Sequence, residues 1–223
     1  MHDLHRLHHC FVLNAVGGCE VVKTGLLLSG GMDSLSIAWW KRPEWAVTID
    51  YGQKAAVAER VASEQVCKAL GIQHEFIKVD CSSLGSGDMA NGVQDAHAAT
   101  SDWWPYRNQL LVTLAGMRAI TQDVNVLYVG TVKSDGESHA DGTPGFVRLI
   151  DQLMSIQEGE LHIVAPAIEY STADLVRHAQ VPPSLLAWAH SCHKSDFPCG
   201  SCRGCYKYLA TYHELGGEYF CGS

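Results

Sequence analysis

The sequence predicts an α/β fold with a doubly wound, mostly parallel sheet, and three observations support this prediction. Short apolar runs alternate with segments of helical period from Val21 onward. Glycine-rich or polar turns follow apolar runs, as at Ser29–Ser34 and Asp50–Gln53. Alternation of this kind places helices on both faces of a parallel sheet. With 223 residues, 47% hydrophobic and 18% charged, the chain is long enough for one such domain and a small appendage.

We expect three regions along the chain: an N-terminal extension over 1–20, the α/β domain over 21–185 and a C-terminal region over 186–223. The extension contains four closely spaced histidines, which are His2, His5, His8 and His9. Their spacing is compatible with a metal site, but no acidic or cysteine partner accompanies them at a fixed distance. We therefore favour an extra strand or a loose terminal segment here.

The predicted elements alternate along the domain in the order that a parallel sheet requires. Strands are predicted over 21–28, 46–49, 74–79, 124–131 and 161–165, and helices over 35–40, 55–70, 109–121, 146–156 and 206–215. A further helix is predicted after Ser171, with Asp174 as its capping-box partner. Residues 81–102 are rich in Gly, Ser, Asp and Ala and lack periodicity, which is typical of a long loop or lid.

The charge balance argues against two classes of partner. The 16 Lys and Arg residues face 24 Asp and Glu residues, so the net charge is −8 and nothing indicates a global affinity for nucleic acid or an anionic membrane. No apolar run approaches the ~20 residues that cross a bilayer, and the polar start lacks the pattern of a signal peptide. We expect a cytoplasmic protein.

The stretch Ser29-Gly30-Gly31-Met32-Asp33-Ser34 lies between the first predicted strand and the first helix. Two glycines at that junction let the backbone approach a ligand, and the free N–H groups of the helix start favour an anion, most often phosphate. No lysine follows the turn, so this is not a Walker-type loop. Asp33 would orient the loop or hold a magnesium ion that bridges phosphates. An ordinary glycine-serine turn remains the alternative.

The turn Asp50-Tyr51-Gly52-Gln53 follows the second predicted strand, and a polar loop from Lys133 to Asp141 follows the fourth. The carboxyl ends of parallel strands lie at one edge of the sheet, which is where such folds bind ligands. We therefore expect both segments and the Ser29–Ser34 loop to face one pocket. Within the polar loop, Lys133, Asp135 and Asp141 are stronger candidates than Glu137 and Ser138, which fit an ordinary solvated loop.

Aromatic residues surround an arginine just before the third helix, in Trp103-Trp104-Pro105-Tyr106-Arg107-Asn108. Aromatic clusters belong to a core more often than to a platform that stacks on a base. Arg107 and Asn108 at a helix start would nevertheless be well placed for a carboxylate, a phosphate or a purine edge. Both interpretations stay open here.

Four of the nine cysteines cluster near the C-terminus with the spacing C-x6-C-x2-C-x2-C, and they are Cys192, Cys199, Cys202 and Cys205. Four thiolates can close a tetrahedron around zinc without leaving an open position, so we predict a structural zinc site. The alternatives are an iron-sulfur cluster, a redox dithiol and a zinc ribbon that contacts nucleic acid. The other five cysteines fit buried or incidental thiols.

These motifs carry a resemblance to known families. Ser-Gly-Gly-x-Asp-Ser resembles the pyrophosphate loop of the ATP-pyrophosphatase (PP-loop) superfamily, whose members activate a carboxylate or carbonyl oxygen with AMP. From Leu26 to Gly216 the chain resembles the 7-cyano-7-deazaguanine synthase family, also called QueC. The matching positions are the 29–34 loop, Asp50–Gln53, Arg107–Asn108, Gly130, Asp135, Asp141, Pro144, Phe146 and the segment with Ser191, Cys192, Cys199, Gly200, Cys202 and Cys205.

The resemblance implies an ATP-dependent ligase with Mg²⁺ that adenylates the carboxylate of 7-carboxy-7-deazaguanine. Ammonia then gives an amide, and a second activation drives dehydration to the nitrile. The implied roles are catalysis by Asp33, Arg107 and Asp135; nucleotide binding by Leu28, Ser29, Gly30, Gly31, Met32, Asp33, Ser34, Asp50, Tyr51, Gly52 and Gln53; and substrate binding by Trp104, Arg107, Asn108, Lys133, Asp135 and Asp141. We also expect a homodimer.

The sequence departs from the family at two places. The family histidine of the second motif is Ala55 here, and the arginine of the Tyr-Pro-Asp-Cys-Arg segment is Thr143. These changes suggest a divergent relative that transfers the activated acid to another amine, such as one on a protein, for example in a defence system. Two further alternatives are a tRNA-thiolating enzyme, which the net charge disfavours, and a binding module without activity, which the intact Ser29–Ser34 loop disfavours.

Overall fold

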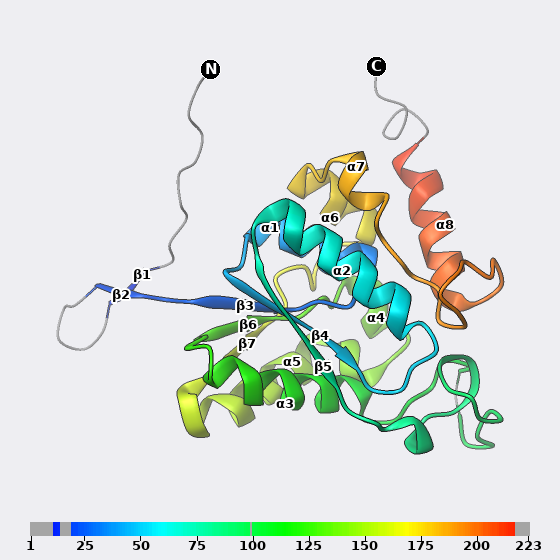
Figure 1. The fold of residues 1–223 in the computed structure, drawn as a ribbon, viewed down its shortest axis with the longest axis horizontal. Coiled ribbons are helices and arrows are strands. Elements are labelled where there is room, and N and C mark those ends of the chain that lie inside the picture. The colour runs from blue at the N-terminus through cyan, green and yellow to red at the C-terminus, as the bar shows by residue number, and fades with distance from the viewer. Residues whose placement is uncertain (1–10, 14–18, 99, 217–223) are drawn as a thin grey trace.

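The centre of the protein is a five-stranded parallel sheet, seen in a computed structural model that describes residues 11–13, 19–98 and 100–216. The strand order is β5-β4-β3-β6-β7, and every pairing in this sheet is parallel (Figure 1). The strands are β3 (Thr24–Leu27), β4 (Trp45–Asp50), β5 (Gln73–Lys78), β6 (Val126–Tyr128) and β7 (His162–Val164). The fold class predicted from the alternating pattern is confirmed.

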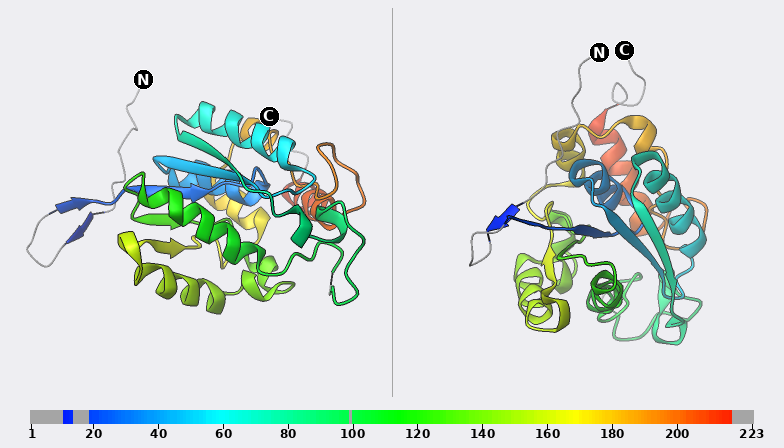
Figure 2. Two further views of the ribbon diagram at one scale, coloured as in Figure 1. Left: turned by 60° about the horizontal axis from the view of Figure 1, so that its bottom comes forward. Right: turned by 60° about the vertical axis from the view of Figure 1, so that its left-hand side comes forward.

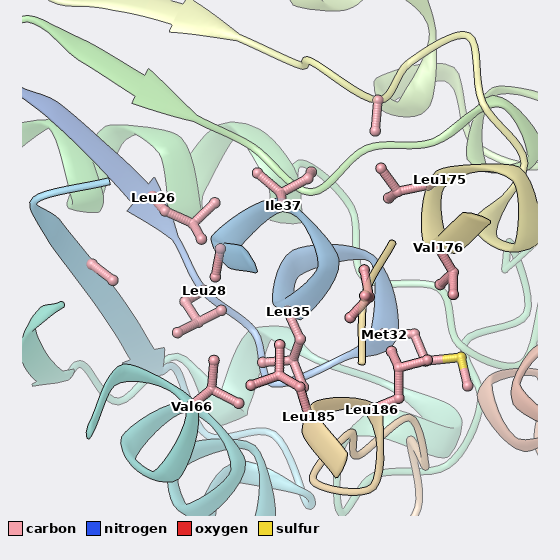
Figure 3. Close-up of a cluster of buried hydrophobic side chains, with 14 of the residues drawn as sticks. Leu26, Leu28, Met32, Leu35, Ile37, Val66, Leu175, Val176, Leu185 and Leu186 are labelled. Atoms are coloured by element: carbon pink, nitrogen blue, oxygen red, sulfur yellow. The ribbon is translucent and has the colours of Figure 1, made fainter. Parts of the chain in front are cut away.

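Helices cover both faces of this sheet (Figure 2). On one face lie α1 (Met32–Lys41), α2 (Ala56–Leu70), α6 (Thr172–Ala179) and α7 (Pro183–Leu186), and on the other lie α3 (Arg107–Ile120) and α5 (Pro144–Ser155). Each face has its own buried cluster. Figure 3 shows the first, in which Leu35 and Ile37 of α1 pack near Leu26 and Leu28 at the central strand.

The order of the strands determines where a ligand can bind. From β3 the chain moves outward through β4 and β5, then crosses to the other side of β3 and continues through β6 and β7. The direction of strand addition therefore reverses beside β3, and the crevice beyond the carboxyl ends of the strands at such a reversal is the usual ligand site of open α/β sheets. The Ser29–Ser34 loop begins two residues after β3 ends.

The segments predicted as a lid and as a polar loop contain short helical turns in the structure. The predicted lid contains two short helical turns, η1 (Ser82–Leu84) and η2 (Gly87–Met89). The polar loop after β6 contains α4 (Lys133–Gly136) and η3 (Ala140–Gly142). The Asp135 carboxylate accepts the Val132 N–H at 3.0 Å and closes the turn at the start of α4. A further turn, η4 (Glu158–Glu160), precedes β7.

The two ends of the described chain lie away from the sheet. Strands β1 (Phe11–Leu13) and β2 (Cys19–Val21) form a separate antiparallel pair, which agrees with the expected extra strand. The four N-terminal histidines lie outside the described residues. At the other end, α8 (Arg203–Leu215) follows the cysteine-rich loop and packs on α6. No helix in the described part of the chain has the length and hydropathy needed to cross a membrane.

The predicted cap of α6 is confirmed in a modified form. Ser171 Oγ accepts the Asp174 N–H at 3.1 Å, as an N-cap residue should. The Asp174 carboxylate accepts the Ser171 hydroxyl at 2.8 Å instead of returning to the Ser171 backbone, so the capping box is not reciprocal.

Candidate active site

A pocket of about 290 Å³ lies at the carboxyl edge of the sheet. Segments far apart in the sequence line it: the 29–33 loop, the lid side of α3, the loop after β6 and the C-terminal region. Of the residues predicted to act in the site, those that line this pocket are Leu28, Ser29, Gly31, Met32, Asp33, Tyr51, Arg107, Asn108, Asp135 and Asp141. The expectation of one pocket shared by the motifs is met at these positions.

The Ser29–Ser34 loop is folded as an anion site requires. Gly30 has φ 75°, and a Cβ there would lie 2.7 Å from the Glu59 carbonyl oxygen, so only glycine fits. Ser34 Oγ donates to the Gly31 carbonyl at 3.0 Å and lies 3.1 Å from Ser29 Oγ, which holds the turn together. Within the described part of the chain, no side chain caps α1 at Gly31. The first N–H groups of α1 are therefore available for a phosphate.

Lys207 of α8 bridges two of the predicted carboxylates. Its Nζ donates to Asp33 Oδ2 and to Asp135 Oδ1, each at 2.9 Å. Burial lowers the pKa of Lys207, but the charges of Asp33 and Asp135 outweigh burial and raise it, so the ammonium stays charged. Burial likewise raises the pKa of Asp33, and Lys207 opposes that rise. Lys207 has no local signature in the sequence and was not among the predicted site residues.

The Asp50–Gln53 motif acts mainly on the backbone around the pocket. Asp50 Oδ1 accepts the Gly52 N–H at 2.9 Å, and Gln53 Oε1 accepts the Tyr51 N–H at 2.8 Å. Gly52 has φ 99°, a conformation that favours glycine. Of the four residues, only Tyr51 lines the pocket. The motif therefore closes the turn between β4 and α2 and positions Tyr51.

Gln53 also holds a buried carboxyl group against the pocket. Its Nε2 donates to Glu59 Oε2 at 2.8 Å, and Glu59 lines the pocket beside Gly30. Burial raises the pKa of Glu59 to about 7, although the Gln53 hydrogen bond and the charge of Arg107 oppose the rise. Glu59 was not predicted, because a glutamate in the first turn of a helix is unremarkable in a sequence.

The aromatic segment before α3 divides between core and pocket. Trp104 is buried, packs edge-on to Tyr51 with ring centroids 4.8 Å apart, and is not part of the pocket wall. Arg107 and Asn108 do line the pocket; one Arg107 nitrogen contacts the Met89 sulfur at 2.8 Å. Lys133 is exposed and lies outside the pocket wall. The guanidinium and amide thus face the site, while the indole supports it from behind.

A second charged cluster surrounds Asp102, which is 3% exposed. Asp102 Oδ2 lies 3.5 Å from His193 Nδ1, 3.9 Å from His139 Nε2 and 3.7 Å from an Arg203 nitrogen. Burial lowers the pKa of His193 to about 4 and also lowers that of His139, so both rings are neutral near pH 7. All four residues line the pocket. They come from separate segments of the chain, so no sequence spacing could have grouped them.

The four clustered cysteines meet in the loop before α8. Their sulfur atoms all lie within 4.8 Å of one another, and both the Cys192–Cys202 and the Cys199–Cys205 sulfur pairs are 3.9 Å apart. Metal–sulfur bonds of about 2.3 Å in a tetrahedron give sulfur separations of about 3.8 Å. The cysteines are free thiols at distances far beyond a disulfide bond. This donor set fits a single tetrahedral metal ion and is too tight for an iron-sulfur cubane.

The fold and the pocket define a class: an ATP-using enzyme of the PP-loop type, with its phosphate loop at the carboxyl end of the central strand. The family model of queuosine biosynthesis protein QueC matches residues 23–216. A 7-cyano-7-deazaguanine synthase of Methanosarcina barkeri is 30% identical over 87% of this chain and 95% of its own length. One of Campylobacter jejuni is 28% identical over 85% and 93%. The chain belongs to the QueC family.

Among solved structures, the chain is similar to the U34-tRNA thiolase NcsA from Methanococcus maripaludis, determined with its [4Fe-4S] cluster. The TM-score is 0.50 at 15% sequence identity, and the match covers 86% of this chain and 64% of NcsA. At that identity the likeness concerns the fold alone. It agrees with the PP-loop arrangement of the sheet.

Proposed function

We propose that the protein adenylates the carboxylate of 7-carboxy-7-deazaguanine and converts it with ammonia, through an amide, to 7-cyano-7-deazaguanine. The observation that carries this proposal is the meeting of the Ser29–Ser34 loop with three cationic side chains around one pocket. Arg107, Arg203 and Lys207 all line it. Two anions, the triphosphate and the acid, must approach each other there. The N–H donors that these cations do not give to Asp33, Asp102 and Asp135 can contact the two anions and offset their repulsion.

The steps follow from the chemistry of acyl transfer. The carboxylate oxygen attacks the α-phosphorus of ATP, pyrophosphate leaves, and an acyl adenylate forms. Ammonia attacks its carbonyl carbon, AMP leaves with the electron pair of the broken C–O bond, and an amide results. The amide oxygen attacks the α-phosphorus of a second ATP, and pyrophosphate leaves again. AMP then departs with that oxygen, the nitrogen gives up its two protons, and the nitrile forms. A pocket lined by α3, the loop after β6 and the C-terminal region supports these steps, because these segments limit the access of water, which would hydrolyse the adenylate.

Two bound ions belong to this proposal. Zn²⁺ would be held by Cys192, Cys199, Cys202 and Cys205, where it closes the loop before α8 without an open coordination position. Mg²⁺ would neutralise the phosphates of ATP and favour departure of pyrophosphate. The predicted roles of the remaining site residues and the predicted homodimer belong to this proposal as well.

The two positions at which the sequence departs from the family, Ala55 and Thr143, have different structural roles. Ala55 is buried at the start of α2. Thr143 caps α5 by accepting the Phe146 N–H at 3.3 Å, and Arg203 reaches the same region, 2.7 Å from His139 Nε2. A guanidinium from α8 therefore reaches His139, four positions before the place where the family has its arginine. This supports retention of the deazaguanine acid as substrate.

The test is mass spectrometry of the products after incubation with ATP, Mg²⁺, 7-carboxy-7-deazaguanine and ammonium. We expect the nitrile and two AMP for each nitrile formed, with no nitrile when ammonium is left out. An amide or adenylate that accumulates while AMP forms would instead favour the second candidate, transfer to another amine such as one on a protein. No consumption of ATP in the presence of the acid would contradict both.

A further inference from the structure

The Lys207 side chain holds a position that a divalent cation could otherwise fill. Its Nζ lies 2.9 Å from a carboxylate oxygen of Asp33, in the first turn of α1, and 2.9 Å from one of Asp135, in the loop after β6. Two carboxylates that converge on one point are typical ligands of Mg²⁺ or Mn²⁺. An ammonium nitrogen and a metal ion cannot share that point, so the structure presents a choice between them.

Because Asp33 is largely buried, its carboxylate needs a positive charge at this point to stay ionised. The Asp33 side chain is 16% exposed, and its Oδ1 is buried. A buried carboxylate that loses its counter-ion is strongly destabilising, because its charge is then left uncompensated away from water. If Lys207 were removed, Asp33 and Asp135 would have to recruit another cation or lose their charge.

The Lys207 ammonium also has capacity left for a ligand. A lysine carries three N–H donors, and Asp33 and Asp135 each accept one. Lys207 lines the pocket together with Ser29, Gly31 and Asp33. The remaining donor is therefore near the loop that would hold phosphate, where a fixed positive charge stabilises the developing charge on oxygen.

The fold holds Lys207 in place from both ends of α8. Cys205 lies two residues before it, within the cysteine cluster, and the Cys205 N–H donates to Cys202 Sγ at 3.4 Å. At the far end, Arg177 of α6 donates to the Glu214 carbonyl at 2.6 Å. The position of the ammonium is thus set by the helix and not by the flexible side chain alone.

We propose that Lys207 is a built-in cation of the nucleotide site: it takes the place of a divalent ion between Asp33 and Asp135 and donates its third N–H to a phosphate oxygen of ATP. Mg²⁺ then enters on the phosphates and is not held by this carboxylate pair. The contact with phosphate rests on the proposed function, whereas the exclusion of a divalent ion between the carboxylates does not.

The first experiment measures bound Mn²⁺ by electron paramagnetic resonance, with the full chain loaded with zinc and without nucleotide. We expect no Mn²⁺ at the carboxylate pair of the unchanged protein, one bound Mn²⁺ per chain in Lys207→Met, and none in the double variant Lys207→Met/Asp135→Asn. The double variant removes one charge of each sign, so it keeps the fold testable. Mn²⁺ bound to the unchanged protein and lost in Asp135→Asn, or no gain in Lys207→Met, would overturn the proposal.

The second experiment measures exchange of pyrophosphate into ATP in the presence of 7-carboxy-7-deazaguanine. We expect Lys207→Met to lower kcat at least ~100-fold, as loss of a charged transition-state contact does, and Lys207→Arg to recover part of it. Lys68→Met, an exposed lysine in the last turn of α2, is the matched control. Equal kcat in Lys207→Met and the control contradicts the phosphate contact. If the unchanged protein shows no exchange, the proposed function fails and the Mn²⁺ measurement alone decides the inference.

Discussion

The two sides of the pocket are built in opposite ways. On the phosphate-loop side, residues 29–34 are contiguous, and the hydrogen bonds of the Ser34 hydroxyl group join it to atoms at most five positions away. On the C-terminal side, Lys207 reaches Asp33 across 174 positions and Asp135 across 72. The phosphate-loop side, here called the near side, offers backbone N–H groups that any short loop can present. The C-terminal side, here called the far side, offers charged side chains that only tertiary structure can bring there. The groups that would bind phosphate thus come from a local loop, whereas the charges that surround it come from distant segments of the chain.

Cys202→Ser gives the largest expected effect, because it removes one of the four cysteines that hold the C-terminal side of the pocket in place. Cys202 Sγ accepts the N–H groups of His193 and Cys205, each at 3.4 Å, and is buried. Loss of a structural metal site removes on the order of 10 kcal/mol of binding free energy, so we expect metal release and a lower melting temperature. Metal content and thermal unfolding check this, with Cys81→Ser as the control. Full metal retention with an unchanged melting temperature would show that the cluster is not a structural metal site.

Asp33→Ala breaks the contact that joins the two sides of the pocket, between Asp33 and Lys207. It removes the carboxylate that Lys207 contacts and the first acidic side chain of α1. We expect acid-dependent ATP consumption to fall about 1000-fold, the size of effect seen for charged groups at phosphoryl-transfer sites. Asp95→Ala in the exposed part of the lid is the control. A binding module without activity would instead show the same background ATP consumption in the unchanged protein, in Asp33→Ala and in Asp95→Ala.

Glu59→Gln tests whether the raised pKa of Glu59, on the phosphate-loop side, makes the free energy of unfolding depend on pH. The pKa of Glu59 is about 7 in the folded protein against 4.5 ordinarily, so the folded state binds more protons between these values. The stabilisation from its protonated form is complete below pH 4.5, falls as pH rises and is lost above 7, by up to ~3 kcal/mol in total. The amide introduced by Glu59→Gln cannot ionise, so the free energy of unfolding of the variant should lack this decline. Urea unfolding at pH 5 and pH 8 measures it; parallel pH dependences would contradict the assignment.

Arg177→Ala gives the smallest expected effect, at the far end of α8. Arg177 pairs with Glu214 at 3.3 Å and with Asp174 at 3.4 Å, and all three side chains are about half exposed. Exposed pairs contribute about 1 kcal/mol or less, so the free energy of unfolding should fall by about that amount. The Mn²⁺ signal should stay absent, since the cysteine loop still holds the near end of α8. Mn²⁺ binding in this variant would mean that the far end of the helix controls Lys207.

The same contrast between near and far contacts decides how much of the molecule was predictable from its sequence. Strand and helix periods, the Ser29–Ser34 loop and the cysteine spacing are local patterns, so the fold class, the phosphate loop and the metal-ligand candidates were all predictable. Element ends were less so: the strand expected over 124–131 is only Val126–Tyr128, because the chain then turns toward the pocket. His193, Arg203 and Lys207 have no local signature. They become site residues only when α8 packs on α6 and the C-terminal region reaches the pocket.

The aromatic segment shows the same limit at one position. Trp104 was a candidate for contact with the substrate ring, and nothing in the spacing separates that role from a core position. In the structure its indole fills the space beside Gly85, where a Cβ would lie 2.5 Å from the ring. Trp104 therefore depends on the fold of a lid whose path has no periodic pattern. Its predicted substrate contact stays a prediction.

The distance in sequence between Asp33 and Lys207 has a consequence for the order in which the protein is made. The phosphate loop, its strand and its helix leave the ribosome long before residue 207 is synthesised. Until then Asp33 and Asp135 have no lysine partner, and the carboxylates either stay hydrated or attract free cations. The pocket gains its final charge only when the last helix docks. A chain cut short before α8 would therefore lack the ammonium group that the finished protein holds between these two carboxylates.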